Sequence, residues 1–260
     1  MMRLFIEGIG LIGPGLDGWP TARGVLAGET LYDATPVRLQ PVALLPPAER
    51  RRSGTTVRLA IGSGVEALAQ AGRDAIDMPI VFAASGSDGE TIHETLSVLA
   101  TQQREVSPTR FHNSVHNAPS GYWALATGSR APSVSLSAYD GTFAAGLLEA
   151  ASQAVVHDYP VTLIAYDVPY PEPLHTARPI EAMFAVALVL NVHRTDRARA
   201  TLAIAMAEAG LAATAIADAA LERLRLGNPA ARALPLLAAI ARGDTATIRV
   251  DGIEMTVTPP

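Results

Sequence analysis

The sequence contains neither cysteine nor lysine among its 260 residues. Without cysteine, the chain itself cannot supply a thiolate nucleophile, a disulfide, a cysteine-ligated zinc site or an iron–sulfur cluster. Because all 20 basic residues are arginines, Schiff-base chemistry on a lysine and the lysine of phosphate-binding loops are excluded as well.

Long apolar runs, positive charge and aromatic residues are also scarce. No apolar run reaches the ~18 residues that a membrane-spanning helix needs, and the opening residues are too few and too acidic for a signal peptide. The formal net charge of -5 argues against a nucleic-acid-binding protein, which normally carries a basic stripe. We therefore expect a cytoplasmic protein with no membrane span and no nucleic-acid partner.

Apolar runs alternate with helical periodicities along most of the chain, which predicts an α/β protein whose parallel or mixed sheet is covered by helices. The residue patterns predict strands at 3–7, 79–84, 132–138, 160–167, 182–191 and 200–207, helices at 55–72, 89–101, 114–127, 141–157, 211–225 and 229–242, and a final hairpin turning at Asp251-Gly252.

Gly8-Ile9-Gly10-Leu11-Ile12-Gly13 matches the spacing of the dinucleotide-binding fingerprint and follows the first predicted strand. The fingerprint requires a helix to begin directly after the glycines, so that its first N–H groups face the pyrophosphate. Here Pro14 and Gly15 follow instead. We interpret the glycines as a tight turn that ends the strand, and we predict no cofactor.

His112 and His116 are four residues apart, a spacing that places two metal ligands on one face of a helix. No glutamate lies between them and no third ligand is evident, so we assign both histidines to hydrogen bonding or packing and predict no metal site.

Asp140 stands directly before Gly141 at a predicted strand-to-helix junction. The simplest expectation is that its carboxylate caps the helix, because the G-x-S-x-G pattern of a hydrolase nucleophile is absent around it.

Five segments, in order, resemble motifs of the first half of a β-ketoacyl synthase, a member of the thiolase superfamily. The segments are Ile6–Gly10, Ala67–Gly72, Val81–Gly86, the run from Ser107-Pro108 through Phe111 and Asn117 to Gly121, and Ser135–Thr142. The resemblance covers about residues 1–192. In the family, the last motif carries the nucleophilic cysteine, and this sequence has Asp140 at that position. The two catalytic histidines of the family have no counterpart here.

The chain resembles the small chain-length-factor-like subunits of aryl-polyene and xanthomonadin-type pigment clusters. This resemblance implies a thiolase-like layered α/β/α fold with one complete N-terminal half, residues 1–193, and a reduced C-terminal region, residues 194–260, that completes the same domain. It also implies a pseudoenzyme without a cofactor. Such a subunit forms a heterodimer with a cognate β-ketoacyl synthase, shapes the acyl tunnel at their interface and meets acyl carrier protein only indirectly.

By the same resemblance, the segment from Phe111 to Pro119 is expected to line the partner's tunnel, and the strand at 132–138 is expected to lie at the dimer interface. The tunnel and interface candidates are Phe111, Ser114, Val115, Ala118, Pro119, Ser135 and Ser137. Two alternatives stay open. The chain could be a stand-alone decarboxylase or hydrolase that uses Asp140 on carrier-bound acyl chains, or it could be a structural homodimer.

Overall fold

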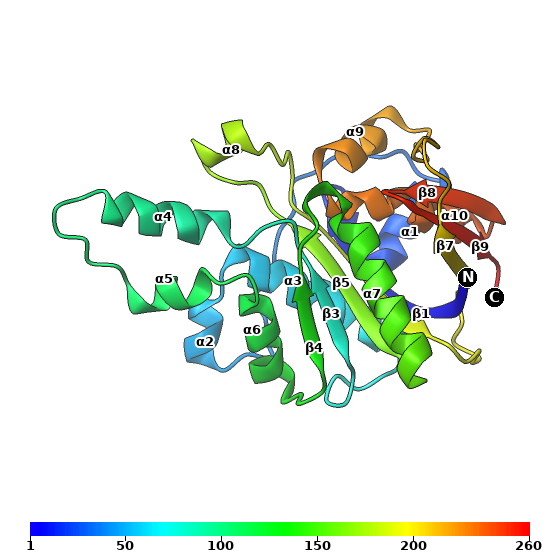
Figure 1. The fold of residues 1–260 in the computed structure, drawn as a ribbon, viewed down its shortest axis with the longest axis horizontal. Coiled ribbons are helices and arrows are strands. Elements are labelled where there is room, and N and C mark those ends of the chain that lie inside the picture. Colours follow the sequence, from blue (N-terminus) through cyan, green and yellow to red (C-terminus); the bar gives the residue numbers. More distant parts are fainter.

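A nine-stranded mixed sheet forms the centre of the molecule (Figure 1), and the computed structural model describes all 260 residues. The strands are β1 (Met2–Gly13), β2 (Leu16–Asp17), β3 (Ile80–Ala83), β4 (Ser133–Leu136), β5 (Val161–Asp167), β6 (Phe184–Asn191), β7 (Ala200–Met206), β8 (Ala246–Val250) and β9 (Ile253–Thr258). Their order in the sheet is β4-β3-β5-β6-β1-β7-β9-β8, with β2 beside β1. The pairs β3–β4 and β3–β5 are parallel and the other pairs are antiparallel. Of the two predicted kinds of sheet, parallel or mixed, the mixed one is confirmed.

Helices cover both faces of this sheet, which confirms the predicted α/β/α layering. They are α1 (Trp19–Ala27), α2 (Pro47–Arg52), α3 (Thr55–Ala71), α4 (Gly89–Leu99), α5 (Pro108–Asn113), α6 (Ala118–Thr127), α7 (Thr142–His157), α8 (Leu174–Ala177), α9 (Ala219–Gly227) and α10 (Leu234–Arg242), with single 3₁₀ turns η1 (Tyr139–Gly141) and η2 (Ala230–Ala233). Side chains of α3 and α6 pack on one face, and those of α1, α7 and α10 pack on the other.

Strand β6 shows why the central strands read as continuous apolar runs in the sequence. All of its residues are buried, and successive side chains enter opposite layers: Val186 and Leu188 belong to the core beneath α7, while Ala187 and Val189 belong to the core beneath α3. A strand buried on both faces needs an apolar residue at every position, not at every second one.

The glycines of β1 lie inside the strand, so their interpretation as a tight turn at its end is wrong. β1 continues through Gly13, and α3 crosses directly over it. A Cβ atom added at Gly8 would overlap the carbonyl oxygen of Ala67, and one added at Gly10 would overlap that of Ser63. These glycines therefore allow α3 to lie close to the sheet, and no helix begins after them as a dinucleotide site requires.

Two predicted helices begin later than the sequence pattern indicated. The helix expected from residue 114 begins at Ala118, because Pro119 lacks an N–H group and fits only in the first turn of a helix. The helix expected from residue 211 begins at Ala219, where the Asp218 carboxylate accepts hydrogen bonds from two backbone N–H groups. The alanine-rich stretch before it is irregular and largely exposed, and helix propensity without tertiary packing is weak.

The chain leaves the body of the molecule in one place. Helices α4 and α5, joined by residues 100–107, project as an arm beside the β4 end of the sheet (Figure 1). At the other end of the sheet, residues beyond 194 add β7, β9 and β8 to the same hydrogen-bonded ladder. None of the helices has the length and apolar character needed to cross a membrane.

Candidate functional site

Residues 137–142 form a turn between the end of β4 and the start of α7, and the hydroxyl of Thr142 holds it. This hydroxyl accepts a hydrogen bond from the Ala138 N–H group at 3.0 Å and donates one to the Tyr139 carbonyl at 2.6 Å. The backbone of Tyr139 has φ +54°, a left-handed conformation that is uncommon for residues other than glycine. As a result, Tyr139 is left 63% exposed, with Asp140 next to it in the turn.

Asp140 does not cap α7, so that prediction is wrong. Gly141 occupies the cap position, and no side chain accepts a hydrogen bond there. The Asp140 carboxylate instead pairs with two guanidinium groups: Arg178 Nη1 lies 2.6 Å from Oδ1, and Arg232 Nη2 lies 3.3 Å from Oδ2. Charge-assisted bonds of this kind are about twice as strong as neutral ones, which explains why the carboxylate turns toward the arginines and away from the helix.

Three ion pairs, these two and one between Arg232 and Asp251, bind four separate segments together. Arg178 follows α8, Arg232 belongs to η2, and Arg232 also forms an ion pair with Asp251 in the turn between β8 and β9. Burial disfavours the charged form of Arg178, but the hydrogen bond and the negative charge of Asp140 outweigh it and raise the pKa of Arg178. The pKa of Asp251 is raised, chiefly by burial and also by the charge of Asp140.

This arrangement limits what Asp140 can do chemically. A carboxylate that acts as a nucleophile or general base gives up negative charge to the reacting atom. Each carboxylate oxygen of Asp140 lies against a guanidinium group, whose positive charge stabilises the carboxylate and opposes that transfer. The geometry is therefore that of a structural ion-pair cluster, and sequence reasoning missed its two arginines because they lie far along the chain in no recognisable motif.

Hydrogen bonds between polar groups at the ends of β3, β4 and β5 connect these strand ends next to the turn. Asp167 Oδ1 accepts hydrogen bonds from the N–H group and the hydroxyl of Ser85, at 2.8 and 2.6 Å. Burial raises the pKa of Asp167 to about 7. The hydroxyl of Ser137 donates to the Ser85 carbonyl at 3.1 Å, so the end of β4 is tied to the end of β3.

The residues expected at a partner interface divide into an exposed and a buried set. β4 is an edge strand that pairs with β3 alone, and along it Ser135 is partly exposed while Ser137 is exposed. Of the expected tunnel segment, Phe111 is 66% and Val115 47% exposed. The remaining candidates are Ser114, which is half-buried, and Ala118 and Pro119, which are buried.

The two histidines of the tunnel segment have local partners. His112 lies edge-on to the ring of Tyr122, and His116 Nε2 lies 3.0 Å from the carbonyl oxygen of Ala84. Nowhere in the chain do three or more His, Asp or Glu side chains gather in a way that could hold a metal ion.

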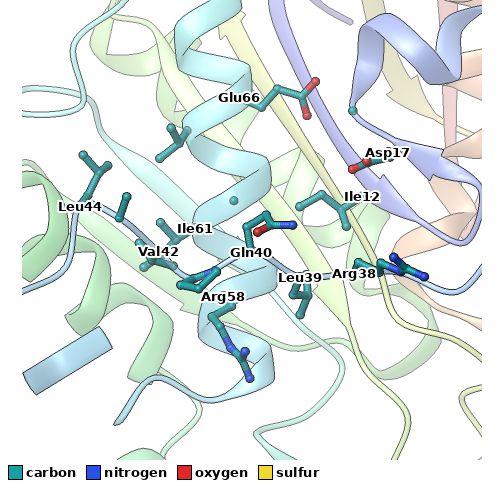
Figure 2. Close-up of a pocket in the computed structure, with 15 residues that line it drawn as sticks. Ile12, Asp17, Arg38, Leu39, Gln40, Val42, Leu44, Arg58, Ile61 and Glu66 are labelled. Carbon is teal, nitrogen blue, oxygen red and sulfur yellow. The ribbon is translucent and has the colours of Figure 1, made fainter. Parts of the chain in front are cut away.

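A groove of about 550 Å³ lies between α3 and the extended residues 36–45 (Figure 2). Glu66 and Asp17 lie at one end and Leu44 at the other. The Glu66 carboxylate accepts hydrogen bonds from the backbone N–H groups of Leu11 and Trp19, at 2.9 and 2.6 Å, so it fixes the start of α1 beside β1. Burial raises the pKa of Glu66. Its hydrogen bonds make it a structural carboxylate.

Comparison with known proteins identifies the family. A family model described as the N-terminal domain of β-ketoacyl synthase matches residues 26–246. The chain belongs to the β-ketoacyl synthase family. The resemblance drawn from the five sequence motifs is thus confirmed. No curated protein sequence matches this family member.

Solved structures show the thiolase-like ketosynthase fold over the whole chain. A chain of the Xenorhabdus doucetiae ketosynthase ApeO in complex with its chain length factor ApeC aligns with a TM-score of 0.72 at 22% identity, covering 99% of this chain and 100% of that chain. The ishigamide ketosynthase/chain length factor aligns with a TM-score of 0.68 at 14% identity, covering 99% and 98%. A type II polyketide ketosynthase complex, AntDE:AntF, aligns with a TM-score of 0.62 at 14% identity, covering 79% and 69%.

Proposed function

We propose that the chain is a non-catalytic, chain-length-factor-like partner of an active β-ketoacyl-ACP synthase in the biosynthesis of a polyene or polyketide of the aryl-polyene type. One observation carries the proposal. Asp140, at the position where the family pattern has its nucleophilic cysteine, is bonded through both carboxylate oxygens to Arg178 and Arg232. The proposed complex is cytoplasmic, and acyl carrier protein contacts this subunit only indirectly.

The chemistry of chain extension supports a non-catalytic role. Condensation requires a thiolate to accept the acyl group, and the chain has no cysteine. An ion-paired carboxylate cannot replace it, and the same ion pairs weaken the alternative that Asp140 serves a decarboxylase or hydrolase. Similar structures include a ketosynthase in complex with its chain length factor and a second ketosynthase/chain length factor, which supports a ketosynthase as the partner.

The open edge of the sheet supports the position of the interface. Strand β4 presents unpaired backbone N–H and C=O groups along its outer side, and such an edge is normally covered or paired. The proposed ketosynthase packs against this edge. Phe111 lies on α5 of the projecting arm and Val115 lies just after it. Both side chains are exposed, and the proposal directs them toward the acyl tunnel of the partner.

Co-purification with the cognate ketosynthase tests the proposal. Arginine at Ser135 or Ser137 places a charged side chain at the β4 edge and should abolish the complex, whose interface is expected to exceed the ~1,200 Å² of stable complexes. Thr247→Arg is the matched control, because Thr247 is exposed on β8, the edge strand at the opposite end of the same sheet. This variant should bind normally.

Two outcomes contradict the proposal. Unchanged binding of both β4 variants would place the interface elsewhere. Self-association of the isolated chain that is lost in the same variants, with no binding to the ketosynthase, would favour a structural homodimer.

A further inference from the structure

Tyr139 combines a strained backbone with an exposed aromatic ring. Its φ of +54° lies in the left-handed region, where the chain has three other residues that are not glycine: Arg104, Asp158 and Asp251. Aspartate tolerates this conformation better than most residues, whereas a bulky side chain makes it an outlier. The ring is 63% exposed, so burial within this chain does not compensate for the strain. An outlier of this kind at a surface points to a function.

Contacts with Arg178 on one face of the ring, and with Thr142 at the backbone, fix the orientation of the Tyr139 side chain. The guanidinium carbon of Arg178 lies 3.7 Å from the ring centroid, which is a close cation–π contact. Arg178 is in turn fixed by Asp140, and the backbone on both sides of the ring is fixed by Thr142. The ring is therefore ordered before any partner arrives, and an ordered side chain loses little conformational freedom on binding.

The ring lies beside the open edge of the sheet. Tyr139 follows β4 after only Ser137 and Ala138, which are exposed as well. Helix α6 runs beside β4 and carries Leu125, which is 56% exposed. Tyrosine and arginine are the residue types that most often dominate binding energy at protein interfaces, where a few ordered side chains fill pockets of the partner.

We propose that Tyr139 is the principal anchor of this chain on its ketosynthase partner, and that Arg178 and Asp140 are positioning residues that hold its ring. The inference rests on the proposed function, because it takes the β4 edge as the interface. The surface of the ketosynthase that fits the ring is an apolar pocket next to the edge of the ketosynthase's own sheet. A hydrogen-bond acceptor inside this pocket would accept the hydrogen bond of the Tyr139 hydroxyl group.

Replacing Tyr139 with glycine separates this role from a purely structural one. Glycine adopts positive φ without strain, which offsets the loss of the ring's contact with Arg178. Tyr139→Gly should therefore melt close to the temperature of the parent chain. Its affinity for the ketosynthase, measured by calorimetry, should fall about 30-fold or more, which corresponds to about 2 kcal/mol at 1.4 kcal/mol per tenfold change.

Two further variants complete the test. Asp158→Gly relieves the same backbone conformation at the far end of α7, and it should leave the affinity unchanged. Arg178→Gln should weaken binding in the parent chain but not in the Tyr139→Gly background, because Arg178 acts through the ring. Such non-additivity is the signature of coupled residues.

The possible failures are distinguishable. Parental affinity of Tyr139→Gly, with binding still abolished by Ser135→Arg, would overturn the anchor and leave the proposed function intact. A melting temperature well below that of the parent would show that the ring is a structural element of this chain. Unchanged binding of all β4 and Tyr139 variants would overturn the proposed interface itself.

Discussion

Asp167 is expected to make the stability of the fold depend on pH. Burial raises its pKa from 3.8 to about 7, although Ser85 and Arg178 act in the opposite direction. The folded chain therefore keeps a proton that the unfolded chain has released, and the free energy of unfolding falls as pH rises from about 4 to about 7. At 1.36 kcal/mol per pKa unit, this single group accounts for a loss of at most about 4 kcal/mol.

Asp167→Asn removes the ionisation and keeps an oxygen for the two hydrogen bonds from Ser85. Whatever the substitution costs at low pH, the stability of the variant relative to the parent should rise by up to about 3 kcal/mol between pH about 4.5 and about 8. Denaturant unfolding of both proteins across this range measures the difference.

Asp196→Asn is the matched control, because Asp196 is exposed and forms no ion pair, and its stability should run parallel to that of the parent. If the difference between Asp167→Asn and the parent does not change with pH, Asp167 is ionised throughout, and the reasoning from burial fails.

Three further predictions concern activity, chain length and stability. Asp140→Cys should neither become acylated nor extend a chain from malonyl carrier protein, because the sequence motifs offer no counterpart of the family's catalytic histidines. Mass spectrometry and product analysis check this, and chain extension by the variant would refute a non-catalytic role. Val115 is 47% exposed, so Val115→Phe should shorten the products of the reconstituted pair without lowering the melting temperature. Ala118 is buried, so Ala118→Phe should instead destabilise the chain by about 1–3 kcal/mol through overpacking. Unchanged products with Val115→Phe, or an unchanged melting temperature with Ala118→Phe, would contradict these two predictions.

The local residue pattern predicted the central strands well, because a strand buried on both faces is a continuous apolar run in the sequence. β3, β5 and β6 are buried on both faces, and only apolar residues fit such positions. The position of the turn at Asp140 was also predictable, since a strand followed by Gly141 and a helix of small residues encodes it locally.

The long-range contacts were not predictable from the same evidence. Whether Gly8 and Gly10 make a turn or a contact surface depends on α3, which lies some 50 residues further along the chain. The partners of Asp140 depend on how α8 and η2 fold back over β5. An aspartate before a helix satisfies the capping pattern whether or not arginines approach it, so composition and spacing could not distinguish the two arrangements.

The place of β1 in the middle of the sheet has a consequence for synthesis on the ribosome. Its main neighbours are β6 and β7, which emerge roughly 170 residues later. At ~5–20 residues per second, β1 and its apolar side chains wait about 10–40 s for their hydrogen-bonding partners. During that interval the nascent chain exposes an unpaired apolar strand, and it is expected to depend on chaperones more than a protein whose neighbouring strands are consecutive.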